Sequence, residues 1–124
     1  MLGDCAVIAF VATTDAPRSR RFYEATLGLR CVADEPYALV FDCCGTMLRV
    51  SRVEKLAPAP FTVLGWKVAD IHSAVTVLSG RGVTFERFPG MEQDNLGIWS
   101  SPGGALVAWF KDPDANLLSL TQYP

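Results

Sequence analysis

Hydrophobic and polar positions along this chain alternate between strand-like and helix-like patterns, and Pro and Gly residues separate the segments. The apolar run Ala6–Ala12 predicts a first strand. Asp15 is suited to cap a helix with Pro17 in its first turn, and we expect this helix to cover Pro17–Leu27 and to end at Gly28. The short strands expected next are Arg30–Ala33, Ala38–Phe41 and Met47–Ser51, the last two joined by a Cys43-Cys44-Gly45 turn.

The same succession begins again after a Pro- and Ala-rich linker at Glu54–Pro60. Phe61–Val68 is strand-like, and Asp70 caps a helix expected over Ile71–Ser79, with apolar residues at helical spacing. Gly80 and Gly82 end that helix, as Gly28 ends the first. The segments that predict the following strands are Val83–Phe88, Ile98–Ser100, Ala105–Phe110 and Leu117–Thr121.

The repeated order of strand, capped helix and strands indicates an internal duplication. We therefore predict an α+β fold of two tandem β-α-β-β-β modules, at residues 5–52 and 61–122 approximately, within a single domain that spans residues 1–124. Each module alone would be marginally stable because a chain of that size buries too little surface. The two modules are expected to form a curved mixed sheet around a shared cleft.

Composition narrows the functional classes. Lys and Arg number 11 against 13 Asp and Glu, so the net charge is −2 and a nucleic-acid partner is not expected. The longest apolar run, Cys5–Ala12, is far shorter than the ~20 residues needed to cross a bilayer. The four cysteines show no zinc-site spacing and accompany no export signal. We expect a cytoplasmic protein with reduced cysteines and no membrane contact.

Two segments carry a resemblance to a known family. They are TDAPRSRRFYEATLGL from Thr14 to Leu29 and WFKDPDANLLSL from Trp109 to Leu120. Together with the repeat, they resemble the vicinal oxygen chelate superfamily, which holds glyoxalase I, extradiol dioxygenases and the bleomycin- and fosfomycin-resistance proteins. The resemblance covers nearly the whole chain and implies a glyoxalase-like fold, but these segments specify helix packing and a turn rather than chemistry. Ala115 stands where the family usually has a turn Gly.

Metal enzymes of this superfamily place His, Gln or Glu on the first and last strand of each module. The matching positions here are Ile8, Arg49, Val63 and Ser119. None of them is a usual ligand of a divalent metal, and the only histidine, His72, lies at the start of the second helix. The resemblance therefore implies a member without the family's metal centre, and we expect no metal and no cofactor.

Strand alternation places a mostly apolar set of side chains in the expected cleft. The cleft-facing partners of Ile8 are Ala6 and Phe10, whereas Val7, Ala9 and Val11 should cover the helix. The candidate ligand-binding residues are Arg49, Lys67, Ser119, Thr121, Phe10, Trp99 and Trp109. Arg49 offers a planar fork to a carboxylate or phosphate, or alternatively forms an ion pair with Asp42 or Glu92. Lys67 lies near a strand end and could extend to water.

Three other features have a functional and a structural interpretation. Trp99 and Trp109 could stack on a flat ligand or form core and dimer contacts, whereas Trp66 has the parity of a core residue. The segment Pro89–Gly97 is either a lid or an ordinary surface loop. Asp112 and Asp114 resemble paired carboxylates, but their Asp-Pro-Asp-x-Asn context is typical of a turn.

Three hypotheses for function follow. The first is metal-independent binding of a small apolar or anionic molecule by a protein similar in architecture to the bleomycin-resistance members of the resembled family. The alternative is a lyase, isomerase or dioxygenase-type enzyme of the same superfamily, and the third is a dimer without a ligand. We also expect a homodimer, because a chain that is 50% hydrophobic and rich in strands leaves apolar surface and sheet edges to cover.

Overall fold

Each half of the chain forms a four-stranded mixed sheet in the structure, a computed structural model that describes residues 1–124. The chain divides into unit 1, Met1–Pro58, and unit 2, Ala59–Pro124. The strand order is β1-β4-β3-β2 in sheet 1 and β5-β8-β7-β6 in sheet 2. In both, the first strand of the unit pairs in parallel with the last. The predicted α+β fold of two repeated modules is confirmed.

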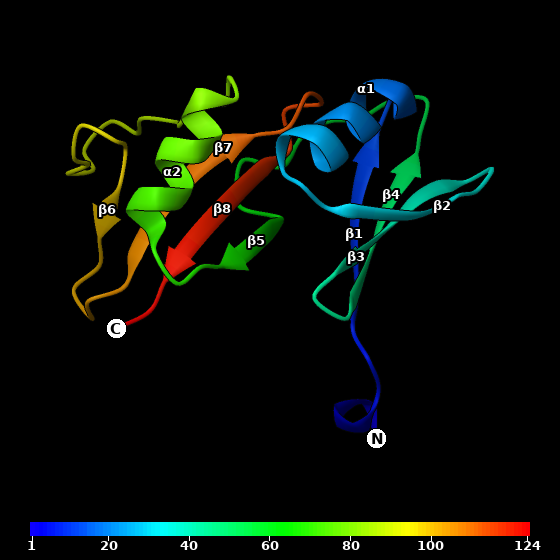
Figure 1. Cartoon of the computed structure of the whole chain (residues 1–124), viewed down its shortest axis with the longest axis horizontal. Helices are drawn as coiled ribbons and strands as arrows, with labels where there is room; N and C mark the ends of the chain where they lie inside the picture. Colours follow the sequence, from blue (N-terminus) through cyan, green and yellow to red (C-terminus); the bar gives the residue numbers. More distant parts are fainter. The chain divides into compact units, whose positions relative to one another are not determined.

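Apart from the segment Val83–Phe88, the elements follow the predicted order (Figure 1). Unit 1 contains η1 (Leu2–Asp4), β1 (Ile8–Thr13), α1 (Ala16–Arg20), η2 (Arg21–Thr26), β2 (Arg30–Asp34), β3 (Ala38–Cys43) and β4 (Thr46–Arg52). Unit 2 contains β5 (Leu64–Lys67), α2 (Ile71–Gly80), β6 (Trp99–Ser100), β7 (Leu106–Lys111) and β8 (Leu117–Gln122). None of the helices is long and apolar enough to span a membrane, and all four cysteines are free.

Both predicted helix caps are present. The Asp15 carboxylate accepts a hydrogen bond from the Arg18 amide at 3.1 Å, and the Asp70 carboxylate accepts one from the Ser73 amide at 3.1 Å. These bonds satisfy amides that have no partner inside the helix. At the other end of α2, Gly82 adopts a φ of 91°, a conformation that favours glycine, as predicted for a helix stop.

The first helix is regular over only part of its predicted length. α1 ends at Arg20, and residues Arg21–Thr26 form the π-helical segment η2, closed by a bond from the Leu27 amide to the Phe22 carbonyl. The wider π turn is not encoded in hydrophobic spacing, so the prediction of a continuous α-helix to Leu27 is wrong in its second half. The segment still anchors unit 1, because Tyr23 is fully buried against Phe41.

Strand alternation separates a helix-facing side from an outer side in unit 1, as predicted. Val11 and Thr13 of β1 and Val50 of β4 are buried with Tyr23. Phe10, on the opposite side of β1, is 58% exposed. One part of this prediction is wrong: Val7 does not cover the helix but is 73% exposed, because β1 begins only at Ile8.

The core of unit 2 lies between α2 and sheet 2. Ile71, Val75 and Leu78 are buried on one stripe of α2, which packs on β7 and β8. The Ile71 amide donates to the side-chain oxygen of Gln122, so α2 covers the face of β8 that carries Leu118 and Leu120. The opposite side of this sheet is the outer face of sheet 2.

The segment Val83–Phe88 is not a strand, contrary to the prediction. Its first amide, at Val83, donates to the Leu78 carbonyl and completes the end of α2. Its last amide, at Phe88, donates to the side chain of Gln93. Only Glu86 donates to β7, at the Trp109 carbonyl, so one isolated bridge forms instead of a ladder.

Candidate functional site

Five of the seven candidate residues share the outer face of sheet 2. Residues directly opposite one another on paired strands point to the same side of a sheet. One row pairs Ser119 with Gly65 on one side and Trp109 on the other. The next row runs through Lys67, Thr121, Val107 and Trp99. The register thus brings Lys67, Trp99, Trp109, Ser119 and Thr121 to one surface of unit 2.

Trp109 is the fixed centre of an aromatic cluster. Its indole N–H donates to the Thr62 hydroxyl at 3.1 Å. Phe88 packs edge-on against it at a centroid distance of 5.4 Å, and Trp99 lies tilted at 6.1 Å. Contacts on several sides hold this indole in place, so Trp109 supports Trp99. Trp66, by contrast, has the helix-facing parity that was predicted: it is half-buried and stacks on buried Phe110.

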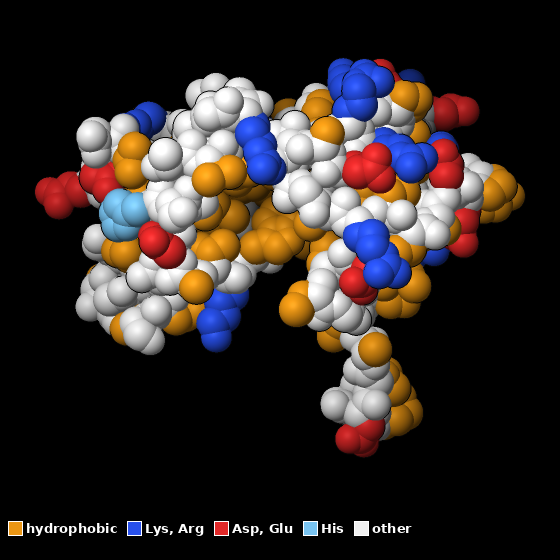
Figure 2. All heavy atoms as spheres, viewed as in Figure 1, with side chains coloured by type: hydrophobic (Ala, Val, Ile, Leu, Met, Phe, Trp, Pro, Cys, Tyr) orange, Lys and Arg blue, Asp and Glu red, His pale blue; other side chains and the backbone are white.

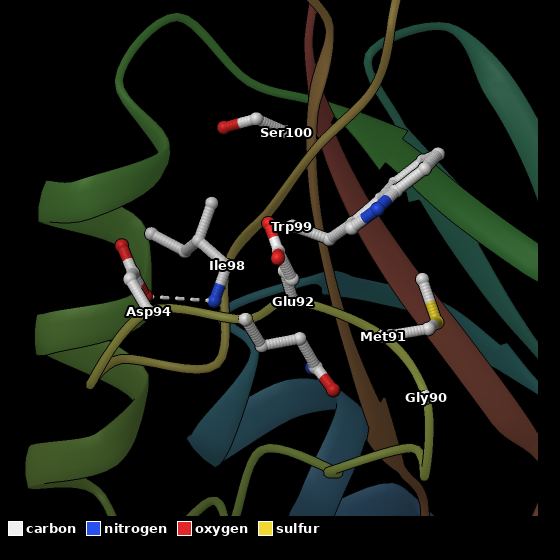
Figure 3. Close-up of a pocket in the computed structure, with 8 residues that line it drawn as sticks. Gly90, Met91, Glu92, Asp94, Ile98, Trp99 and Ser100 are labelled. Carbon is white, nitrogen blue, oxygen red and sulfur yellow. Dashed lines mark hydrogen bonds between the residues drawn. The ribbon is translucent and has the colours of Figure 1, made fainter.

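Trp99 borders an open pocket of about 700 Å³, a size typical of small-ligand sites (Figure 3). The residues that line it are Gly90, Met91, Glu92, Gln93, Asp94, Ile98, Trp99 and Ser100. We call this the Trp99 pocket. Figure 3 shows the Trp99 indole and the Met91 thioether on the side away from α2, while Asp94 lies on the α2 side. Trp109 does not line the pocket.

Gln93 holds the loop that forms the pocket wall. Its side-chain amide donates to the carbonyls of Glu86 and Gly97 at 2.9 and 2.8 Å, and its oxygen accepts from the Phe88 amide at 2.8 Å. Gly97 has a φ of 86°, and a Cβ there would lie 3.3 Å from the Phe85 Cβ. These constraints make Pro89–Gly97 a braced loop rather than a free flap.

Asp94 closes the same loop at its tip. Its Oδ1 accepts from the amides of Leu96 and Ile98, both at 2.9 Å. Its Oδ2 lies 3.9 Å from His72 Nε2 at the start of α2. The sequence left both a lid and a surface loop open for this segment, and it identified neither the roles of Gln93 and Asp94 nor the pocket. The only available signal was the run of polar residues between two glycines.

Ser119 and Lys67 belong to a second, smaller part of the outer face. A Cβ on Gly65 would lie 2.7 Å from Ser119 Oγ, so glycine at position 65 makes room for this side chain. Lys67 and Thr121 line a pocket of about 230 Å³ with Tyr123, and the Lys67 Nζ lies 5.9 Å from the Tyr123 ring centre. Lys67 therefore has a cation–π contact inside its own unit.

The other two candidates, Phe10 and Arg49, are direct neighbours on the outer face of sheet 1. Arg49 Nη1 forms an ion pair with Glu35 Oε1 at 3.0 Å. The ion pair considered from the sequence therefore exists, but its partner is Glu35 rather than Asp42 or Glu92. Glu35 follows β2 and comes close to β4 through the fold, so sequence separation concealed it. A ligand role for Arg49 stays a prediction.

The four positions that carry metal ligands in the metal enzymes of the resembled family do not form a donor set here. Ile8 and Val63 have hydrocarbon side chains, and Arg49 is a cation already paired with Glu35. Ser119 contributes one hydroxyl. No group of three or more His, Cys, Asp or Glu residues in the chain could hold an ion. These residues do not fit the metal centre of those enzymes.

Solved structures with a similar fold come from several bacteria. A glyoxalase family protein from Enterococcus faecalis matches with a TM-score of 0.75 at 17% identity, over 98% of this chain and 99% of the other. A lactoylglutathione lyase from Agrobacterium tumefaciens matches with 0.73 at 16% identity, over 95% and 93%. A superfamily member from Sphaerobacter thermophilus matches with 0.70 at 26% identity, over 94% and 97%.

Comparison with curated proteins gives no significant match. A family profile, described as the Glyoxalase/Bleomycin resistance protein/Dioxygenase superfamily, matches residues 5–120 and so covers both units. It includes both helix caps, the Trp99 pocket and the turn at Ala115. The chain belongs to the glyoxalase/bleomycin resistance protein/dioxygenase superfamily.

Proposed function

We propose that this protein binds a small molecule with an apolar surface at the Trp99 pocket, without a divalent metal. The observation that carries the proposal is the half-buried Trp99 indole, which borders a pocket of about 700 Å³ and is supported by Trp109. An aromatic wall beside polar side chains that can orient a ligand is typical of small-ligand sites. The braced loop around Gln93 supports a pocket that is formed before the ligand arrives.

An anionic ligand is the second form of this proposal. Lys67 and Thr121 share the outer face of sheet 2 with Ser119 and would supply one cation and one hydroxyl group, whereas the Ser119 side chain is buried. In unit 1, Arg49 would bind an anion of its own only if that anion displaced Glu35 from its guanidinium. The Lys67 contact with Tyr123 leaves the ammonium group accessible, since the Lys67 residue is exposed.

The proposal is tested by following the indole N–H signals in a two-dimensional NMR titration with benzyl alcohol, a neutral aromatic probe. The Trp99 signal is assigned from its loss in Trp99→Phe. We expect a saturable shift of the Trp99 signal, unaffected by EDTA, while the signal of Trp66, which does not line this pocket, stays constant. A Trp99 signal that stays constant, or a shift that EDTA abolishes, would contradict metal-independent binding at this pocket.

We also propose a cytoplasmic homodimer. Met1, Leu2 and Val7 are exposed by 94%, 73% and 73%, and Figure 2 shows hydrophobic side chains on the N-terminal segment that extends from unit 1. Phe10 adds an exposed ring on the outer face of sheet 1. Such surfaces are commonly covered by a second copy. Light scattering at micromolar concentration should give twice the mass of the chain, and a monomer would refute the dimer.

A further inference from the structure

The Trp99 pocket is acidic as well as aromatic. Glu92 and Asp94 line it, and its lining contains no Lys, Arg or His. Two basic residues contact the loop outside this lining: His72 Nε2 lies 3.9 Å from Asp94 Oδ2, and Arg87 donates to the Gln93 carbonyl at 3.4 Å. A ligand in the pocket therefore meets two carboxylates and no lining cation.

The two carboxylates differ in their bonding to the rest of the chain. Asp94 is committed to the loop, because its Oδ1 accepts from two backbone amides. Glu92 is exposed and forms no hydrogen bond or ion pair with the rest of the chain. In Figure 3 its carboxylate points from the loop toward Ser100. Glu92 is thus the charged group in this pocket that is available to a ligand.

The remaining walls favour an apolar body next to a positive charge. Trp99 offers an indole, the aromatic surface that attracts cations best, and Met91 and Ile98 add thioether and hydrocarbon surface. We infer that the Trp99 pocket binds an organic cation, a primary or quaternary ammonium group attached to an apolar or aromatic body. This inference rests on the proposed function and names the ligand class at the same pocket.

The alternative of an anion at this pocket has no support among its lining residues. An anion beside Glu92 and Asp94 would be repelled at short range in a partly desolvated site. The two basic candidate residues that could bind an anion, Lys67 and Arg49, do not line this pocket. Lys67 lines a separate pocket with Tyr123, and Arg49 pairs with Glu35 in unit 1.

The test compares three probes of similar size: phenyltrimethylammonium, benzyl alcohol and benzoate. Each is titrated into the protein at millimolar concentrations and low salt, with the Trp99 indole N–H signal as the readout. We expect phenyltrimethylammonium to bind at least about tenfold more tightly than benzoate, because cation–π attraction and carboxylate charge act together. Benzyl alcohol should lie between them.

Glu92→Gln keeps the size of the side chain and removes its charge. It should weaken phenyltrimethylammonium about two- to fivefold, as expected for an exposed charge pair, and leave benzyl alcohol unchanged. Glu54→Gln is the matched control, since Glu54 is exposed in unit 1 and does not line the pocket. It should leave every affinity unchanged.

Two results separate failure of this inference from failure of the proposed function. The preference for an organic cation is refuted if phenyltrimethylammonium binds no better than benzoate, or if Glu92→Gln does not weaken its binding. Binding of benzyl alcohol in that case would leave the pocket a binding site, as the proposed function states. If none of the three probes shifts the Trp99 signal, both the cation and the proposed pocket are refuted.

Discussion

Replacing Gln93 with Ala tests whether one side chain holds the wall of the Trp99 pocket. The substitution removes three hydrogen bonds, to the Phe88 amide and to the Glu86 and Gly97 carbonyls. Each such bond contributes about 0.5–1.5 kcal/mol net, so the free energy of unfolding should fall by about 2–4 kcal/mol. The upper part of this range applies because Gly97 is buried and its carbonyl would lose its partner.

Gln122→Ala is the matched control in the same unit. Gln122 makes one comparable bond, as its Oε1 accepts from the Ile71 amide at 2.8 Å. Its loss should cost about 0.5–1.5 kcal/mol. Urea unfolding followed by tryptophan fluorescence measures both variants, and hydrogen exchange at the Phe88 amide reports the loop directly. Exchange at Phe88 should accelerate in Gln93→Ala and stay unchanged in Gln122→Ala.

Gln93→Glu tests the donor bonds of this side chain apart from its acceptor bond, because the variant loses the NH₂ group and keeps the oxygen. It keeps an oxygen for the Phe88 amide but directs a carboxylate at the Glu86 and Gly97 carbonyls. Two facing carbonyl oxygens disfavour the charged form, so the folded state should raise the pKa of this carboxyl above its usual value of about 4.3. The free energy of unfolding of this variant should therefore be highest at low pH and should decrease as the pH rises through the folded-state pKa of the new carboxyl at position 93.

The prediction for Gln93→Ala is contradicted if this variant lowers the free energy of unfolding no more than Gln122→Ala does. The loop would then not depend on the Gln93 side chain.

Three further outcomes are expected, all measured by thermal or urea unfolding. Gly65→Ala should lower the free energy of unfolding by about 1–3 kcal/mol, because its Cβ would lie 2.7 Å from Ser119 Oγ, and adding Ser119→Ala should recover part of the loss. Ala115→Gly should raise the free energy of unfolding by about 1 kcal/mol, since Ala115 has a φ of 66°, a left-handed conformation that glycine adopts more readily. Zn²⁺, Ni²⁺, Mn²⁺ or Fe²⁺ should leave the Tm unchanged. A specific site would instead raise the free energy of unfolding by about 2.7 kcal/mol at a free metal concentration of 100 times its Kd, and the Tm would rise with it.

Features that depend on short-range chemistry were predictable from the sequence. The caps at Asp15 and Asp70 and the stop at Gly82 follow from backbone groups that a helix end leaves unpaired. The Asp112 turn is also as predicted, because the Asp112 carboxylate accepts from the Asp114 and Asn116 amides. Ala115 itself adopts the left-handed conformation.

Features that depend on partners distant in sequence were not predictable. Arg49 lies on the outer face of its strand, as alternation requires, but no periodicity could identify Glu35 as its partner. The π-helical segment at Arg21–Thr26 has the hydrophobic spacing of an ordinary helix, and only its backbone hydrogen bonds, such as that from the Leu27 amide to the Phe22 carbonyl, distinguish it. Alternation fixes the side of a strand on which a residue lies, and tertiary contacts decide what it meets there.

The candidate site lies where the two repeated units differ. In unit 1 the edge strand β2 pairs with β3 along Arg30–Asp34, whereas in unit 2 the edge strand β6 is only Trp99–Ser100. The segment before it cannot extend the sheet, because the Val83 amide completes α2 and the Phe88 amide bonds to Gln93. The loop that follows this segment, held by Gln93, forms the wall of the Trp99 pocket. Local sequence rules predict the duplicated fold, and the pocket arises where tertiary hydrogen bonds override the strand pattern.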